Sequence, residues 1–191
     1  VELVDDVVPF ETAKLRMLNG AHSLLAYCGL EAGYTYVHEA VADPRLAALA
    51  ERLMRDEAIP TITAAPGQDL AAYAGQLMQR FADPALMHRL DQIAMDGTQK
   101  IPQRWLDTAA ELVRRGQPFD AIATGFAAWV WHLADGRFVD DPYGEELHTL
   151  AAEKGSPALV ARCFGPCPKA AALWPRYEHL AATMLRQAQP S

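Results

Sequence analysis

The chain has 191 residues, and 51% of them are apolar, which suits one folded domain with a sizeable core. Its formal net charge is −7 with acidic and basic residues interspersed, which argues against the concentrated basic face that nucleic-acid binding requires. No apolar run approaches the ~18 residues that span a membrane, and the acidic stretch of residues 1–6 is unlike a signal peptide.

Apolar residues recur with helical periodicity along nearly the whole chain, and this pattern predicts an all-α fold. Pro9 and Glu11 suit the first turn of a helix, while Asp43, Asp69 and Asp83 suit N-cap positions. The predicted helices cover residues 9–30, 36–42, 43–58, 69–81, 83–95, 102–115, 119–133, 144–153, 156–163 and 168–187. Loops are expected over 59–68 and 135–142, a helix stop at Gly97, and strand-like alternation over residues 1–8.

Three cysteines, Cys28, Cys163 and Cys167, are present. The odd count and the missing signal peptide favour free thiols in a reducing compartment. A zinc site at Cys163 and Cys167 would need two further ligands, and no second cysteine pair exists. We therefore expect a cytoplasmic protein that binds no metal, no nucleic acid and no membrane.

The first predicted helix carries Lys14, Asn19 and His22 among apolar neighbours. At 100° per residue, Asn19 lies roughly 140° and His22 roughly 80° from Lys14, so all three open onto one broad face. A partly desolvated lysine can act as a general base, and amide and imidazole N–H groups can stabilise a developing alkoxide. From spacing alone, the alternative is that Lys14 extends into solvent, Asn19 marks a kink and His22 is a hydrogen-bonded core residue.

The sequence around Lys14, Asn19 and His22 closely resembles the signature of the polyol-specific long-chain dehydrogenases. In that family a Lys, four residues, an Asn, two residues and a His follow one another in this order. The family contains mannitol 2-dehydrogenases and the reductases of fructuronate and tagaturonate. Residues 93–102, Ile-Ala-Met-Asp-Gly-Thr-Gln-Lys-Ile-Pro, resemble its second conserved stretch, and the resemblance extends well over residues 1–135.

This resemblance implies a role for each candidate residue. Lys14 would be the catalytic acid/base, Asn19 would help to form the oxyanion site, and His22 would orient the reacting hydroxyl. Lys100 would bind the far end of the sugar, where it is the expected cationic partner of a substrate carboxylate. Its position in a predicted loop is equally typical of a solvated lysine. Gln92, the other residue expected to bind substrate, stands where mannitol-specific members carry an Arg. That difference favours fructuronate and mannonate as the substrate pair, with fructose and mannitol as the alternative.

The cofactor is expected to bind outside this chain. A dinucleotide site needs a Gly-rich turn between a strand and a helix, and no G-x-G-x-x-G occurs here. The resemblance implies NAD or NADP held by an upstream Rossmann domain of the same protein. Residues 1–191 would then form a helical substrate-binding domain that resembles the C-terminal domain of 6-phosphogluconate dehydrogenase.

The expected activity is that of an NAD(P)-dependent alcohol dehydrogenase acting on the CH–OH group of a small sugar or sugar acid. The isolated chain is expected to be inactive, because hydride transfer needs the nicotinamide held against the substrate carbon. Two other function classes also fit an all-helical chain. One is a helical module that binds a partner without chemistry, and the other is a helical transcription-factor domain, which the acidic charge opposes.

Overall fold

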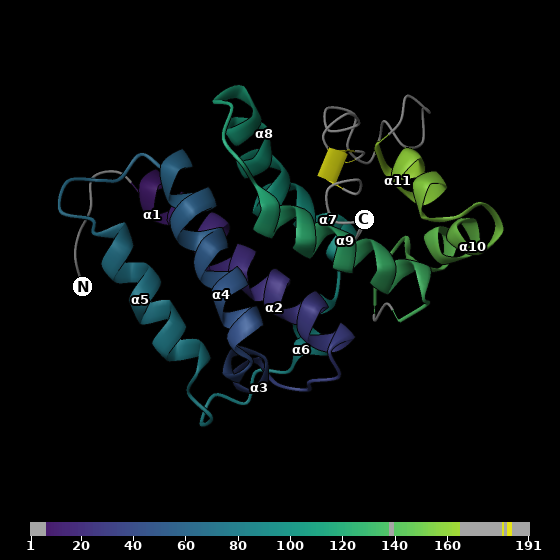
Figure 1. Cartoon of the computed structure of the whole chain (residues 1–191), viewed down its shortest axis with the longest axis horizontal. Helices are drawn as coiled ribbons and strands as arrows, with labels where there is room; N and C mark the ends of the chain where they lie inside the picture. The colour runs from purple at the N-terminus through teal and green to yellow at the C-terminus, as the bar shows by residue number, and fades with distance from the viewer. Residues whose placement is uncertain (1–6, 138–139, 165–180, 182, 185–191) are drawn as a thin grey trace.

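The computed structural model describes residues 7–137 and 140–164 together with residues 181, 183 and 184 (Figure 1). Within these residues the regular structure is helical, apart from an isolated antiparallel bridge, so the predicted all-α fold is confirmed. In chain order the segments are α1 (Val8–Ala13), η1 (Lys14–Asn19), α2 (Gly20–Glu31), α3 (Val37–Ala42), α4 (Pro44–Arg52), η2 (Leu53–Ala58), η3 (Ile59–Thr61), α5 (Leu70–Phe81), α6 (Leu90–Ala94), α7 (Gly97–Ile101), η4 (Pro102–Leu106), α8 (Asp107–Arg114), α9 (Asp120–Ala134), α10 (Gly144–Lys154) and α11 (Ser156–Phe164).

The first helix runs without a break through α1, η1 and α2, which confirms the helix predicted over residues 9–30. Pro9 and Glu11 occupy its first turn as predicted. Nine of the twelve residues of α2 are buried, and α2 packs against α3, α4, α6 and α9 (Figure 1). A helix that is apolar on all sides belongs inside a protein, and α2 is accordingly the centre of this fold.

Aspartate caps set two of the following helix starts, as the sequence predicts. The Asp43 carboxylate accepts a hydrogen bond from the backbone N–H of Arg45 at 2.9 Å, at the start of α4. The Asp69 carboxylate accepts one from the N–H of Ala72 at 2.9 Å, at the start of α5. The helix predicted over 43–58 is formed by α4 and η2 together. The predicted loop after it opens with the short 3₁₀ turn η3.

The helix predicted over 83–95 is wrong in its first half. The Asp83 carboxylate accepts a hydrogen bond from the backbone N–H of Ala85 in a turn, and helix α6 begins only at Leu90. Between these points the chain first turns, with the Leu86 N–H donating to the Asp83 carbonyl at 3.1 Å. It then pairs with a distant segment, where the backbone N–H of Val37 donates to the carbonyl of His88 at 3.0 Å. Pairing with a distant segment therefore decides the conformation here, and it overrides the local Asp-Pro signal.

The predicted helix stop at Gly97 is also wrong, because Gly97 begins α7. An added Cβ at Gly97 would lie 2.3 Å from the Tyr27 hydroxyl and 2.7 Å from the Trp129 indole nitrogen. Glycine is present here for close packing rather than to end a helix. Segments α7, η4 and α8 follow one another directly, so the helix predicted over 102–115 is confirmed and starts five residues earlier than predicted.

The later helices α9, α10 and α11 confirm the three predicted over 119–133, 144–153 and 156–163. Helix α9 packs against α2 and is buried along most of its length (Figure 1). The helix predicted over 168–187 lies outside the described residues except for residues 181, 183 and 184. Residues 1–6 of the strand-like segment also lie outside them, and Val8 is helical.

Three π turns meet around the first helix, because η1 packs against both η2 and η4. These segments approach closely at Gly20, where an added Cβ would lie 3.3 Å from the Arg104 carbonyl oxygen and 3.3 Å from Leu53 Cδ2. The Trp105 indole N–H donates to the Gly20 carbonyl at 3.0 Å across the same contact. Because π turns are frequent at functional sites, this junction is a candidate for the functional site.

Candidate active site

The π turn η1 contains two of the predicted site residues, Lys14 at its start and Asn19 at its end. The backbone N–H of Gly20 donates to the Leu15 carbonyl, five residues back, and this bond defines the turn. In a π turn, side chains five residues apart lie nearly above one another. Lys14 and Asn19 are therefore closer in direction than the roughly 140° that a regular α-helix would give.

Lys14 is exposed and Asn19 is half-buried. Within the described part of the chain, neither side chain takes part in a hydrogen bond or an ion pair. The backbone thus presents an ammonium group and an amide whose donors are unused by the described residues. Both groups are available to a bound molecule at this side of the first helix.

His22 lies three residues after Asn19, and its ring packs against Phe81 at 4.7 Å and His88 at 5.9 Å between ring centroids. Its Nε2 atom is buried and has no hydrogen-bond partner among the described residues. A hydrogen-bonded core histidine would have one, so that alternative does not describe this nitrogen. Burial first, and then the positive charges of His88, Arg104 and Arg80, lower the pKa of His22 to about 4. The imidazole is consequently neutral near pH 7 and able to donate or accept one hydrogen bond.

Lys100 is helical rather than part of a loop, since α7 already includes it. It is half-buried, and its Nζ donates to the Met95 carbonyl at 2.6 Å and lies 3.9 Å from an oxygen of Asp96. Burial and the nearby Arg104 lower the pKa of Lys100, whereas Asp96 and Asp141 oppose that shift. Lys100 therefore already has protein partners. The other predicted substrate ligand, Gln92, is exposed on α6.

Arg104 is a charged residue in this region that sequence reasoning missed. It lies in η4, one helical turn after Lys100, and its Nη1 donates to the hydroxyl of Ser23 at 2.7 Å. Its guanidinium acts electrostatically on both His22 and Lys100, which places it near both. The four-residue spacing from Lys100 could have revealed it. A helix start predicted at residue 102 concealed that spacing.

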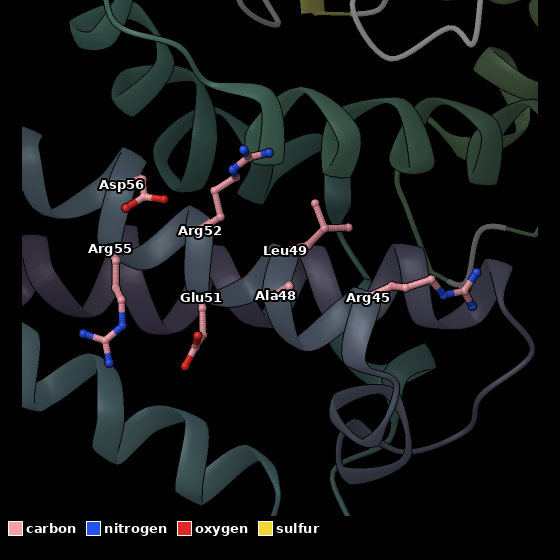
Figure 2. Close-up of a pocket in the computed structure, with 7 residues that line it drawn as sticks. All are labelled: Arg45, Ala48, Leu49, Glu51, Arg52, Arg55 and Asp56. Atoms are coloured by element: carbon pink, nitrogen blue, oxygen red, sulfur yellow. The ribbon is translucent and has the colours of Figure 1, made fainter.

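A surface hollow of about 400 Å³ lies elsewhere, along α4 and η2. It is lined by Arg45, Ala48, Leu49, Glu51, Arg52, Arg55 and Asp56. Figure 2 shows Arg52 and Arg55 extending from the helix in opposite directions, and both are exposed. The lining includes none of the predicted site residues and carries both signs of charge, so it is separate from the site on the first helix.

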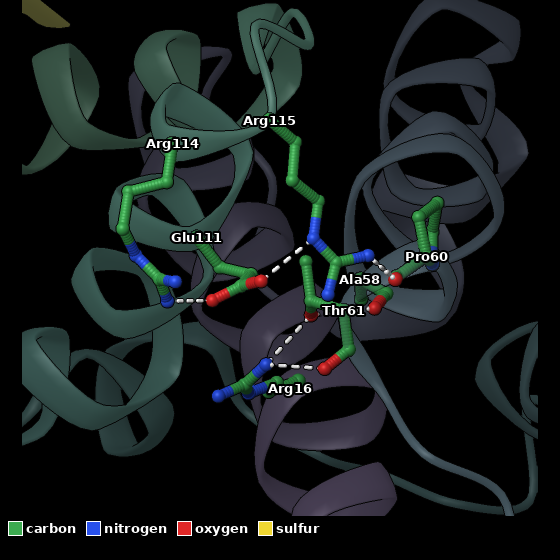
Figure 3. Close-up of polar contacts among 7 residues, drawn as sticks. All are labelled: Arg16, Ala58, Pro60, Thr61, Glu111, Arg114 and Arg115. Atoms are coloured by element: carbon green, nitrogen blue, oxygen red, sulfur yellow. Dashed lines mark hydrogen bonds and ion pairs between the residues drawn. The ribbon is translucent and has the colours of Figure 1, made fainter.

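The side of η1 that carries Arg16 is anchored to other helices (Figure 3). Arg16 Nη1 donates to the carbonyl and to the hydroxyl of Thr61, at 2.8 and 2.7 Å. Arg115, the residue directly after α8, donates to the Pro60 carbonyl at 2.6 Å and pairs with Glu111 at 2.6 Å. The backbone of the π turn is thereby tied to η3 and indirectly to α8.

Comparison with known proteins identifies the family of the chain. Residues 6–156 match the family described as the mannitol dehydrogenase C-terminal domain. The chain belongs to this family.

Two relatives of this mannitol dehydrogenase C-terminal domain are named for a sugar acid and a sugar alcohol. D-mannonate oxidoreductase of Escherichia coli K12 is 47% identical over 158 residues, which are 80% of this chain and 32% of the relative. Mannitol 2-dehydrogenase of Aspergillus oryzae is 38% identical over 166 residues, which are 83% of this chain and 33% of the relative. The chain therefore spans about a third of the length of these curated relatives.

A solved structure supports the same assignment. The ternary complex of Pseudomonas fluorescens mannitol 2-dehydrogenase with NAD and D-mannitol superposes with a TM-score of 0.77 and 29% identity. The match covers 97% of this chain and 42% of that one. The family expected from the Lys14, Asn19 and His22 signature and the helical fold expected from periodicity are both confirmed.

The described residues of this mannitol dehydrogenase C-terminal domain contain no group of three or more His, Cys, Asp or Glu arranged to hold a metal ion. Cys28 and Cys163 are buried free thiols, and Cys167 lies outside the described residues. In the same part of the chain, no helix combines the length and the apolar character that crossing a membrane requires.

Proposed function

We propose that this domain is the substrate-binding and catalytic half of an NAD(P)-dependent oxidoreductase that interconverts a 2-keto sugar acid and its secondary alcohol. The substrate pair that we favour is fructuronate and mannonate. The observation that carries the proposal is the π turn η1, which directs Lys14 and Asn19 to one side of the first helix, with the unpartnered Nε2 of His22 one turn later. The 47% identity to a D-mannonate oxidoreductase supports the acid substrate.

In this proposal Lys14 is the general base for alcohol oxidation. Its neutral amine takes the hydroxyl proton as a hydride leaves the same carbon, and the ketone forms. In the reverse direction its ammonium returns that proton to the alkoxide. The ammonium is exposed in this domain, so the partial desolvation that favours the neutral amine must come from bound substrate and a covering domain.

Asn19 and His22 stabilise the oxygen on which charge develops. The Asn19 amide N–H and an N–H of the neutral His22 ring are donors already in place before substrate binds. Lys100 and Gln92 bind hydroxyl groups further along the sugar.

A bound nicotinamide supplies the hydride exchange. This chain lacks a Gly-rich turn between a strand and a helix, so its own residues do not fit the cofactor. We place the cofactor on an upstream Rossmann domain of the same protein.

Mannitol 2-dehydrogenase is the second candidate function, and the structural match to the complex with D-mannitol favours it. The deciding experiment measures kcat/KM of the full-length protein for fructuronate and fructose with NADH and NADPH. A higher value for fructuronate supports the proposal, and a higher value for fructose favours the mannitol enzyme. Turnover of neither substrate would refute the enzyme function and favour a helical binding module.

A further inference from the structure

Arg104 is a half-buried cation without a carboxylate partner in the described part of the chain. The hydroxyl of Ser23 accepts a hydrogen bond from its Nη1 at 2.7 Å, and this oxygen carries no charge. Burial lowers the pKa of Arg104, but a guanidinium does not lose its proton in proteins. A partly buried charge that is neither paired nor neutralised is costly, so an anionic partner would stabilise this arrangement.

The position of Arg104 beside the proposed site is fixed by the backbone. Ser23 is four residues after Asn19 and directly follows His22, so in helix α2 it shares a face with Asn19. The contact of η4 with Gly20, one residue after Asn19, holds the Arg104 backbone against the same helix. The guanidinium therefore lies about one helical turn along the helix from Asn19, a rise of about 6 Å.

The surrounding charges favour an anion at this place. The groups that act electrostatically on His22 are His88 and the guanidinium groups of Arg104 and Arg80, and none of them is a carboxylate. Lys100 differs, because its Nζ is bound to the Met95 carbonyl and has carboxylates nearby. The positive charge of Arg104 is thus less compensated than that of Lys100.

We propose that Arg104 binds the substrate carboxylate and so determines the preference for a keto-sugar acid over a neutral ketose. This inference rests on the proposed function. In fructuronate the carboxylate lies four carbon–carbon bonds from the carbonyl carbon, about 5 Å with bonds of about 1.5 Å. That span matches the rise from Asn19 to Ser23. Lys100 is then left to bind a hydroxyl group.

The test compares kcat/KM for fructuronate and fructose in variants of the full-length enzyme. We expect Arg104→Met to lower the fructuronate-to-fructose ratio by about 10- to 150-fold, the range of one charge-assisted hydrogen bond. Arg104→Lys should retain part of the preference, because it keeps the positive charge but loses the planar guanidinium, whose paired N–H donors match a carboxylate. Arg114→Met, at an exposed arginine in α8, is the matched control and should leave the ratio unchanged.

Three results would overturn the inference while leaving the enzyme function intact. They are an equal loss for both substrates in Arg104→Met, a fall of the ratio in Lys100→Met but not in Arg104→Met, and a wild-type enzyme that prefers fructose. If Arg104→Met does not fold, as judged by circular dichroism, Arg104→Lys decides, and an unchanged ratio refutes the inference. Turnover of neither substrate by the wild-type enzyme defeats the proposed function and this inference together.

Discussion

Replacing Glu57 with glutamine should change how the stability of the domain depends on pH. Glu57 is only 3% exposed, and its two carboxyl oxygens accept hydrogen bonds from the backbone N–H groups of Ala121 and Ile122, at 2.7 and 2.9 Å. These are N–H groups of the first turn of α9, which have no partner within their own helix. Glu57 therefore joins the end of the second π turn, η2, to the start of a buried helix.

Burial raises the pKa of Glu57 from 4.5 to about 7, although the two backbone hydrogen bonds oppose this shift. Between these pH values the folded protein holds a proton that the unfolded chain has released. The contribution of Glu57 to the free energy of unfolding is consequently at its full value below about pH 4.5 and is lost as the pH rises through about 7. At 1.36 kcal/mol per pH unit, the loss is about 3 kcal/mol.

Glu57→Gln removes this titration. At pH 5 the variant should be less stable than the wild type by about 1–3 kcal/mol, because one backbone N–H then faces an amide NH₂. By pH 8 the difference should vanish or reverse. Urea unfolding of both proteins at several pH values measures this, with Glu51→Gln on the exposed side of α4 as the control. An unchanged pH dependence in Glu57→Gln would show that Glu57 is already ionised throughout and that its hydrogen bonds outweigh burial.

Three further substitutions test the site and the packing around it. Lys14→Ala in the full-length enzyme should lower kcat at least ~100-fold, the scale of a positioned general base, and a raised KM with unchanged kcat would make Lys14 a binding residue. His22→Phe should lower kcat about 100-fold without lowering the Tm of the domain, since it removes an unpartnered buried nitrogen; a lowered Tm would indicate a structural role. Gly97→Ala should destabilise the domain by about 1–3 kcal/mol in urea unfolding, because its Cβ would overlap the Tyr27 hydroxyl. Gly75→Ala in α5, where the added Cβ has room, is the matched control and should not destabilise.

The sequence predicted the elements whose conformation depends on neighbouring residues. Asp43 and Asp69 cap helices as predicted because a cap needs only the next three residues of the same chain. Asp83 carries the same signal, yet residues after it pair with the chain near Val37. Gly97 was misassigned for a similar reason, since its role depends on two side chains distant in sequence.

The candidate site was predictable in its residues but not in its geometry. The order of Lys14, Asn19 and His22 was sufficient to indicate the family. Their directions were not predictable, because a π turn differs from an α turn by the register of a few hydrogen bonds and has little compositional signal. Arg104 was missed because its contact with Ser23, 81 residues away in sequence, arises from the packing of two helices.

The π turn at the start of the site can also be regarded as a one-residue insertion in an otherwise regular helix. Deleting a single residue between Lys14 and Asn19 would restore the ordinary hydrogen-bond register and give a helix that is locally more regular. Lys14 and Asn19 would then be four residues apart in a regular helix, roughly 40° from each other, and would still share a face. The π turn therefore accommodates one extra residue while keeping the two site residues in nearly the direction they would have without it. A redesign that made this helix regular without shortening it would instead place them roughly 140° apart and misalign the site.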